Sequence, residues 1–115
     1  MSDISSTIQQ WIDSSNSYDT EAYIKFFDKD AVIDEQSIGT TLKGTDDIKE
    51  YFETYFIGYK THTTILELSV KDDTHAFIKI HFSGTFPQKE LDGWFDLTFN
   101  DAGDKIVFAA TDFES

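Results

Sequence analysis

Residues 19–35 read DTEAYIKFFDKDAVIDE, and residues 42–52 read LKGTDDIKEYF. The first segment predicts a short amphipathic helix, then two phenylalanines, then an apolar strand that ends in Asp34 and Glu35. The second segment predicts a glycine turn followed by a helix rich in aromatic residues. This order places the two carboxyl groups at the end of a strand that faces an aromatic helix. It therefore predicts both a fold and a pocket.

The composition predicts one compact domain over residues 1–115. The chain is 39% apolar and 16% aromatic, which is enough to bury a core built largely of rings. It contains no cysteine, which excludes disulfides and thiolate metal sites. The first residues, MSDISS, carry no positive charge and no apolar run, and no membrane-spanning stretch of apolar residues follows. We therefore expect a cytoplasmic protein.

The charge balance limits the classes of partner. Acidic residues outnumber basic ones 22 to 9, which gives a formal net charge of -13. Such a surface repels phosphate backbones and anionic lipid headgroups, so we expect neither a nucleic acid nor a membrane as partner. All nine basic residues are lysines, and without arginine no bidentate guanidinium group is available for a phosphate. This disfavours phosphate-rich cofactors, and we expect no cofactor.

Three helices are predicted in the first half of the chain. A first helix, capped by Ser2 or Asp3, ends near Ser15 and carries an apolar stripe of Ile4, Ile8, Trp11 and Ile12. Asp19 can cap a second, shorter helix that ends near Phe27. The third helix follows a glycine and has the clearest stripe: Ile48, Tyr51, Phe52, Tyr55 and Phe56.

From Thr61 onward the pattern changes to alternation, which predicts four strands at about residues 61–71, 75–86, 91–100 and 105–113. Helices followed by long antiparallel strands are typical of the α+β class. Apolar residues that share one face fix the expected registers. The first hairpin pairs Val70 with Ala76, Leu68 with Ile78, Leu66 with Ile80 and Thr64 with Phe82. The second pairs Phe82 with Phe95, Ile80 with Leu97 and Ile78 with Phe99. The third, in which Gly103 is free to take positive φ, pairs Phe99 with Ile106 and Leu97 with Phe108.

These elements resemble the nuclear transport factor 2-like superfamily, in its SnoaL-like and ketosteroid isomerase branches. The resemblance spans nearly the whole chain. Its most specific residues are FFxxDAVIDE at 26–35, GxxxIxxYF at 44–52, and FNDxG at 99–103 before Ile106. It implies a cone-shaped α+β barrel, in which three N-terminal helices pack on a curved, mainly antiparallel sheet around a pocket. Because the superfamily is functionally diverse, the resemblance indicates a fold rather than an activity.

In the ketosteroid isomerase branch a carboxylate at the end of the strand before the glycine shuttles a proton, and the resemblance places Glu35 at that position. A carboxyl group enclosed by rings has a raised pKa and can act as a base near neutral pH. The branch also uses a helix-one tyrosine and a protonated aspartate as an oxyanion hole. Trp11 and Phe95 stand at those positions here. Phe95 donates no hydrogen bond and the Trp11 indole is a weak donor, which argues against the isomerase reaction. The alternative for Glu35 is a solvated carboxylate at a strand end, and Asp34 has the opposite parity and is expected to be the more exposed.

The predicted pocket combines few polar groups with many rings. His62 and Thr64 share parity with the core face of their strand. The expected polar residues are Glu35, Tyr18, Tyr55, His62 and Thr64, and the expected rings are Trp11, Phe27, Phe52, Phe56, Phe82 and Phe95. This composition suits a small, apolar, uncharged ligand. The alternative is that the rings simply fill the core.

No metal site is expected from the three histidines. His75 and His81 are six residues apart on one strand, about 20 Å at 3.3 Å per residue, and cannot share an ion. His62 is expected on the opposite face. The predicted register places His81 across from Asp96, and this cross-strand pair is not accompanied by a nucleophile.

The face of the sheet away from the helices carries two large rings, Phe77 and Trp94, and is also expected to place Glu67 across from Lys79. Such an apolar surface often marks a partner site. Members of the superfamily commonly pair through the sheet, so the resemblance implies a homodimer. The expected contacts are Phe77, His81, Trp94 and Asp96.

Three functions remain open from the sequence. The first is a ligand-binding or structural homodimer without catalysis, favoured by the missing oxyanion donors. The second is an enzyme of proton transfer, dehydration, cyclisation or epoxide hydrolysis with Glu35 as general base and His62 or a tyrosine as helper. The third is a protein adaptor that uses the outer face of the sheet.

Overall fold

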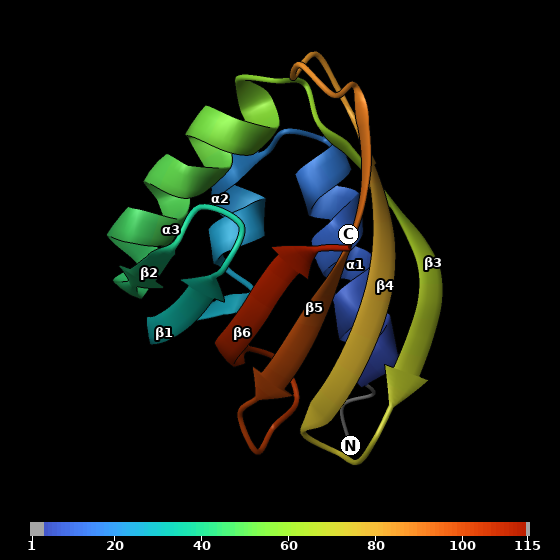
Figure 1. Ribbon diagram of the computed structural model, residues 1–115. Helices are drawn as coiled ribbons and strands as arrows, with labels where there is room; N and C mark the ends of the chain where they lie inside the picture. The colour runs from blue at the N-terminus through green and yellow to red at the C-terminus, as the bar shows by residue number, and fades with distance from the viewer. Residues whose placement is uncertain (1–3, 115) are drawn as a thin grey trace.

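The computed structural model describes residues 4–114, in which helices lie against the concave face of a strongly curved six-stranded sheet (Figure 1). The elements are α1 (Ile4–Asn16), α2 (Thr20–Ile24), β1 (Phe27–Glu35), β2 (Thr40–Lys43), α3 (Gly44–Phe52), the π-helix η1 (Glu53–Ile57), β3 (His62–Val70), β4 (His75–Ser83), β5 (Glu90–Phe99) and β6 (Ile106–Phe113). The strand order is β2-β1-β6-β5-β4-β3. Within the described residues β2 and β3 are free edges, so the sheet is curved but open. The α+β prediction is confirmed.

The N-terminal helices form where the apolar spacing predicts them. α1 buries Ile8 and Trp11 against the sheet, and its predicted caps lie outside the described residues. The predicted cap of α2 is confirmed, because the Asp19 side chain accepts a hydrogen bond from the backbone N–H of Ala22 at 3.2 Å. α2 ends at Ile24, however, and the prediction that it extends to near Phe27 is wrong. Phe27 begins β1, where it pairs with a residue of β6.

The third predicted helix consists of two parts. α3 runs from Gly44 to Phe52, and the wider turns of η1 continue it to Ile57. The change in pitch keeps Phe56 buried but leaves the Tyr55 side chain 38% exposed. One strand was not predicted. β2 pairs antiparallel with β1, which in turn runs parallel to β6.

The first predicted hairpin is confirmed only near its turn. Val70 pairs with Ala76 and Leu68 with Ile78, but a β-bulge between Ile65 and Glu67 then shifts the register. Ile80 therefore faces Ile65, and Phe82 faces Thr63, so the predicted pairs Leu66–Ile80 and Thr64–Phe82 are wrong. A bulge adds one residue to one strand and reverses the faces beyond it.

The second predicted hairpin has the correct faces but the wrong register. Its loop occupies residues 84–89, closed by the Gly84 N–H donating to the Lys89 carbonyl at 3.0 Å. Phe82 consequently pairs with Leu91, Ile80 with Gly93 and Ile78 with Phe95, instead of Phe95, Leu97 and Phe99. An even shift leaves each side chain on its predicted face, which is why the core is preserved.

In the third hairpin Phe99 pairs with Ile106 as predicted, and Gly103 has a φ of +73°. A second bulge then places Leu97 opposite Ala109 rather than Phe108, whose side chain is 40% exposed. No helix in the described part of the chain is long and apolar enough to span a membrane.

Candidate functional site

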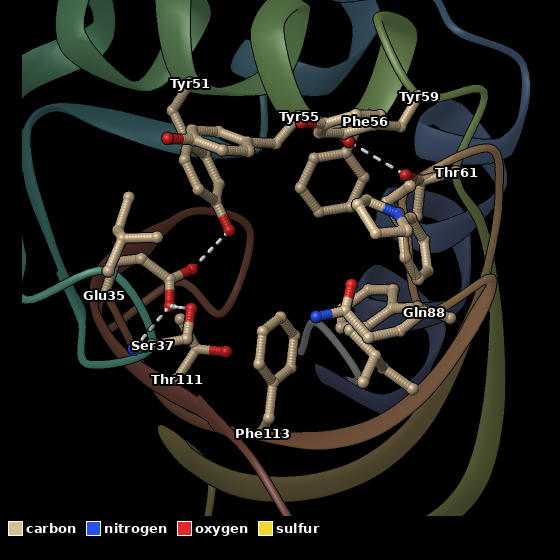
Figure 2. A pocket seen from close by; sticks show the side chains of 15 residues that line it. Glu35, Ser37, Tyr51, Tyr55, Phe56, Tyr59, Thr61, Gln88, Thr111 and Phe113 are labelled. Atoms are coloured by element: carbon tan, nitrogen blue, oxygen red, sulfur yellow. Dashed lines mark hydrogen bonds between the residues drawn. The ribbon is translucent and has the colours of Figure 1, made fainter.

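A partly open pocket of about 270 Å³ lies between the C-terminal half of the third helical segment and the ends of the strands (Figure 2). Its wall comes from the end of β1 and the turn after it, from α3, η1 and the segment that follows η1, from β4, β5 and the loop between them, and from the last residues of β6. The lining residues are Glu35, Ser37, Ile38, Tyr51, Tyr55, Phe56, Tyr59, Thr61, Phe82, Phe86, Pro87, Gln88, Leu91, Thr111 and Phe113.

Glu35 is the charged group of this pocket. It is the last residue of β1, it pairs with Thr111 of β6, and only 4% of it is exposed. One carboxylate oxygen, Oε2, accepts a hydrogen bond from the Tyr51 phenol at 2.5 Å. The other, Oε1, accepts from the Ser37 hydroxyl at 2.5 Å and from the Ser37 backbone N–H at 3.1 Å (Figure 2). Three donors thus hold a buried carboxylate that forms no salt bridge with any described residue.

Tyr51 is held as a neutral hydrogen-bond donor. Burial raises the pKa of its phenol well above the ordinary value, and the neighbouring charge of Glu35 raises that pKa further. Deprotonation would place two negative charges within hydrogen-bond distance of one another. The Tyr51 hydroxyl therefore continues to donate to Glu35 well into the alkaline range.

A comparison with protein-family models identifies the family of this chain. The model of the SnoaL-like domain matches residues 8–113, which is nearly the whole chain. This chain belongs to the SnoaL-like domain family. A comparison with curated proteins found no match.

Solved structures similar to this SnoaL-like domain share its fold. One is SalBIII, described as an epoxide hydrolase/cyclase-like enzyme with a role in pyran ring formation in the polyether salinomycin. It is 15% identical to this chain, the alignment covers 96% of this chain and 90% of SalBIII, and the TM-score is 0.82. A Mycobacterium tuberculosis protein in complex with estradiol-17β-hemisuccinate is 18% identical, with 94% and 91% covered and a TM-score of 0.82. A Catenulispora acidiphila protein with a ketosteroid isomerase-like fold, in complex with trimethylamine, is 16% identical, with 94% and 85% covered and a TM-score of 0.80.

The structure separates the predicted pocket residues into three groups. Glu35, Tyr55, Phe56 and Phe82 line the pocket. Four predicted rings instead lie in the closed core of the SnoaL-like domain: Trp11, Phe27, Phe52 and Phe95. The Trp11 and Phe95 rings meet edge to face with centroids 5.2 Å apart. Trp11 and Phe95, which the resemblance assigns to the oxyanion positions, are thus in contact with one another.

The third group does not line the pocket. His62 pairs with Ser83 and Thr64 with His81, so the β3 bulge places both on the outer face of the sheet, where both are exposed. The prediction that they share the core face, with His62 opposite the other histidines, is wrong for this reason. Tyr18, with a φ of +55°, lies in the turn after α1 and is 37% exposed.

Several lining residues were not predicted. Tyr51 was assigned to the stripe of the third helix but not to the pocket, although its stripe faces the strand that ends in Glu35. Ser37 follows Glu35 by two residues, a spacing at which a serine can donate locally to a carboxylate. Phe86 and Phe113 enter from a loop and from the end of β6, and their positions depend on the hairpin register that the sequence did not provide.

The outer face of the sheet carries a separate cluster. Phe77 and Trp94 stack with centroids 5.9 Å apart and planes 24° apart. The predicted Glu67–Lys79 pair is present at 3.9 Å. Asp96 lies across from Phe77 rather than His81, because of the β4–β5 register.

His81 instead contacts two other carboxylates. Its Nδ1 lies 2.6 Å from Asp92 and its Nε2 lies 3.1 Å from Glu90. The hydrogen bond to Asp92, followed by that to Glu90, raises the pKa of His81 above its ordinary value. Both ring nitrogens are engaged, and the described residues contain no group of side chains arranged to hold a metal ion.

Proposed function

We propose that this SnoaL-like domain binds a small, largely apolar organic molecule in the pocket beside Glu35. The observation that carries this proposal is the partly open cavity of about 270 Å³, in which rings surround one buried carboxylate. Apolar walls with a few placed polar groups are typical of small-molecule sites, and this volume lies just below their usual range of about 300–1,000 Å³. The complexes of two similar structures with small molecules support the same reading.

The test is a ligand-observed NMR screen of neutral and charged fragments with two tryptophan variants. Ile38 is 44% exposed at the pocket wall, so Ile38→Trp obstructs the pocket with little cost to the fold. Leu66 is 56% exposed and does not line the pocket, so Leu66→Trp is the matched control. We expect fragments whose affinity falls at least fivefold in Ile38→Trp and is unchanged in Leu66→Trp. Fragments that bind both variants equally would contradict the proposal.

A second candidate is catalysis with Glu35 as general base, in proton transfer, dehydration, cyclisation or epoxide hydrolysis. The pairing of Glu35 with Tyr51 favours it, because a carboxylate and a neutral phenol at one pocket wall are a base and a donor. The similarity to an epoxide hydrolase/cyclase-like enzyme supports testing this class. Any turnover found should be lost in Glu35→Gln and kept in Asp34→Asn, which changes the adjacent carboxylate outside the pocket wall.

We further propose that the domain acts in the cytoplasm as a homodimer, paired through the outer face of the sheet around Phe77, His81, Trp94 and Asp96. The stacked rings of Phe77 and Trp94 support this surface. Sedimentation velocity should show a dimer for the natural chain and a monomer for Trp94→Ser. Leu66→Ser, on the edge strand, should remain dimeric. A dimer that persists in Trp94→Ser would contradict this interface, and a natural chain that is monomeric would favour the adaptor function for the same rings.

A further inference from the structure

We propose that the pocket selects a cation, namely an organic amine or quaternary ammonium group held against Glu35 and the surrounding rings. This inference rests on the proposed small-molecule function and defines its ligand class. It departs from the expectation of an uncharged ligand, which was based on the ratio of rings to polar groups alone.

The first argument is the unbalanced charge of Glu35. The residue is 4% exposed, and its three hydrogen bonds come from neutral donors, one phenol, one hydroxyl and one backbone N–H. The salt bridges of the described residues all involve other carboxylates. A buried carboxylate without a counter-charge is costly, and a bound cation would supply the missing charge.

The second argument is the sign of the charge around the pocket. None of the fifteen lining residues is a lysine, an arginine or a histidine. The chain carries a formal net charge of -13, which raises the local concentration of cations and lowers that of anions. An anionic ligand would meet a carboxylate with no positive partner beside it. A neutral ligand would leave Glu35 uncompensated.

The third argument is the wall of rings. Seven of the fifteen lining residues are aromatic: Tyr51, Tyr55, Phe56, Tyr59, Phe82, Phe86 and Phe113. They form a nearly continuous series of ring contacts, with centroid distances of 5.5 Å from Tyr51 to Tyr55, 6.4 Å from Tyr55 to Tyr59 and 6.0 Å from Tyr59 to Phe86. Aromatic faces attract ammonium groups, and cages of such rings recognise methylated amines. Rings and carboxylate together thus favour an ammonium group with apolar substituents over a metal ion or a fully hydrated cation.

The experiment uses two water-soluble probes of the same shape, choline and 3,3-dimethylbutan-1-ol. Choline has a quaternary nitrogen where the alcohol has a quaternary carbon, so the difference between their affinities measures the effect of the positive charge alone. Binding is measured by calorimetry and by pocket amide shifts in NMR, at about 0.15 M salt where the general field of the chain is largely screened. We expect choline to bind at least tenfold more tightly than the alcohol.

Two variants and one control locate the effect. Glu35→Gln should weaken choline at least tenfold and change the affinity of the alcohol by less than twofold. Asp34→Asn removes the same formal charge next to the pocket and should leave choline within twofold. Tyr59→Leu, at a side chain that is 36% exposed, removes one ring without touching Glu35 and should weaken choline at least threefold. It keeps the test valid if Glu35→Gln fails to fold.

The outcomes separate this inference from the proposed function. Equal binding of both probes, or tighter binding of the alcohol, would overturn the selection for a cation and leave a small-molecule pocket. An equal loss of choline affinity in Asp34→Asn and Glu35→Gln would overturn the assignment to Glu35. If neither probe binds and the fragment screen finds no ligand sensitive to Ile38→Trp, both proposals fail.

Discussion

Tyr51→Phe should destabilise the fold by about 2 kcal/mol, because it removes one oxygen atom that donates to the Glu35 carboxylate at 2.5 Å. The ring remains, so the packing of Tyr51 against Tyr55 and Phe56 is preserved. The perturbation therefore isolates one hydrogen bond in a side chain that is 8% exposed.

The magnitude follows from the surroundings of Glu35. A hydrogen bond to a charged group contributes about 1.5–3 kcal/mol to stability. Removal of the phenol leaves Oε2 of Glu35 without a donor among the described residues, whereas Oε1 keeps both of its hydrogen bonds to Ser37. The pocket is partly open, so water can take the place of the lost donor at this oxygen, which places the expected loss in the lower half of that range.

The assay is urea unfolding at pH 7, followed by tryptophan fluorescence. Tyr55→Phe is the matched control, since Tyr55 also lines the pocket but is 38% exposed, and it should change stability by less than about 0.5 kcal/mol. A double-mutant cycle of Tyr51→Phe and Glu35→Gln should give a coupling energy of about 1–3 kcal/mol. Additive effects, or a loss for Tyr51→Phe no larger than that of the control, would refute the role assigned to this hydrogen bond.

Three further predictions concern the ionisation of Tyr51 and two contacts elsewhere in the domain. Because burial raises the folded-state pKa of Tyr51, its contribution to the free energy of unfolding is complete below pH 10 and declines above it. In urea unfolding between pH 10 and 11.5, the stability of Tyr51→Phe should therefore fall less steeply than that of the natural chain, by up to about 1.4 kcal/mol per pH unit. Asn16→Ala should cost about 1–3 kcal/mol in urea unfolding, because the Asn16 amide joins α1 to β3 by two hydrogen bonds with the Thr63 backbone, at 2.9 and 2.7 Å, whereas Gln9→Ala on the exposed face of α1 should cost less than about 0.5 kcal/mol. Because the pKa of His81 is raised in the folded state, its contribution to stability is greatest below pH 6.5 and is lost as pH rises through the folded-state pKa. NMR titration should show a lower pKa for His81 in Asp92→Asn than in the natural chain.

The sequence predicted the elements because each depends on local spacing. The stripe of α1, the cap at Asp19 and the alternation of the four long strands are properties of a few adjacent residues. The short strand β2 was not predicted, since four residues give too little alternation to distinguish a strand from a turn. Its formation depends on pairing with β1, which is a tertiary contact.

The inward-facing residues were predicted less completely because β-bulges decide which side chains face inward. The bulge between Ile65 and Glu67 turns His62 outward, and the bulge after Thr98 exposes Phe108. Nothing in a strictly alternating pattern marks where a bulge will occur. Register shifts by an even number of residues, such as that between β4 and β5, preserve the faces and thus the core, but they move Phe95 away from the site.

The contact between Glu35 and Tyr51 combines both kinds of information. The strand that ends in Glu35 and the aromatic stripe of the third helix were predicted to face one another, but an ideal α-helix would place Tyr51 and Tyr55 on the same face. The π-helix that begins at Glu53 interrupts that repetition, so Tyr51 is 8% exposed and bonded to Glu35 while Tyr55 is 38% exposed at the pocket wall. The π-helix η1 ends this helical segment at Ile57, and its wider turn changes the position of Tyr55 relative to Tyr51. The two tyrosines therefore have different roles. Tyr51 donates a hydrogen bond to the Glu35 carboxylate, and Tyr55 contributes an aromatic ring to the pocket wall.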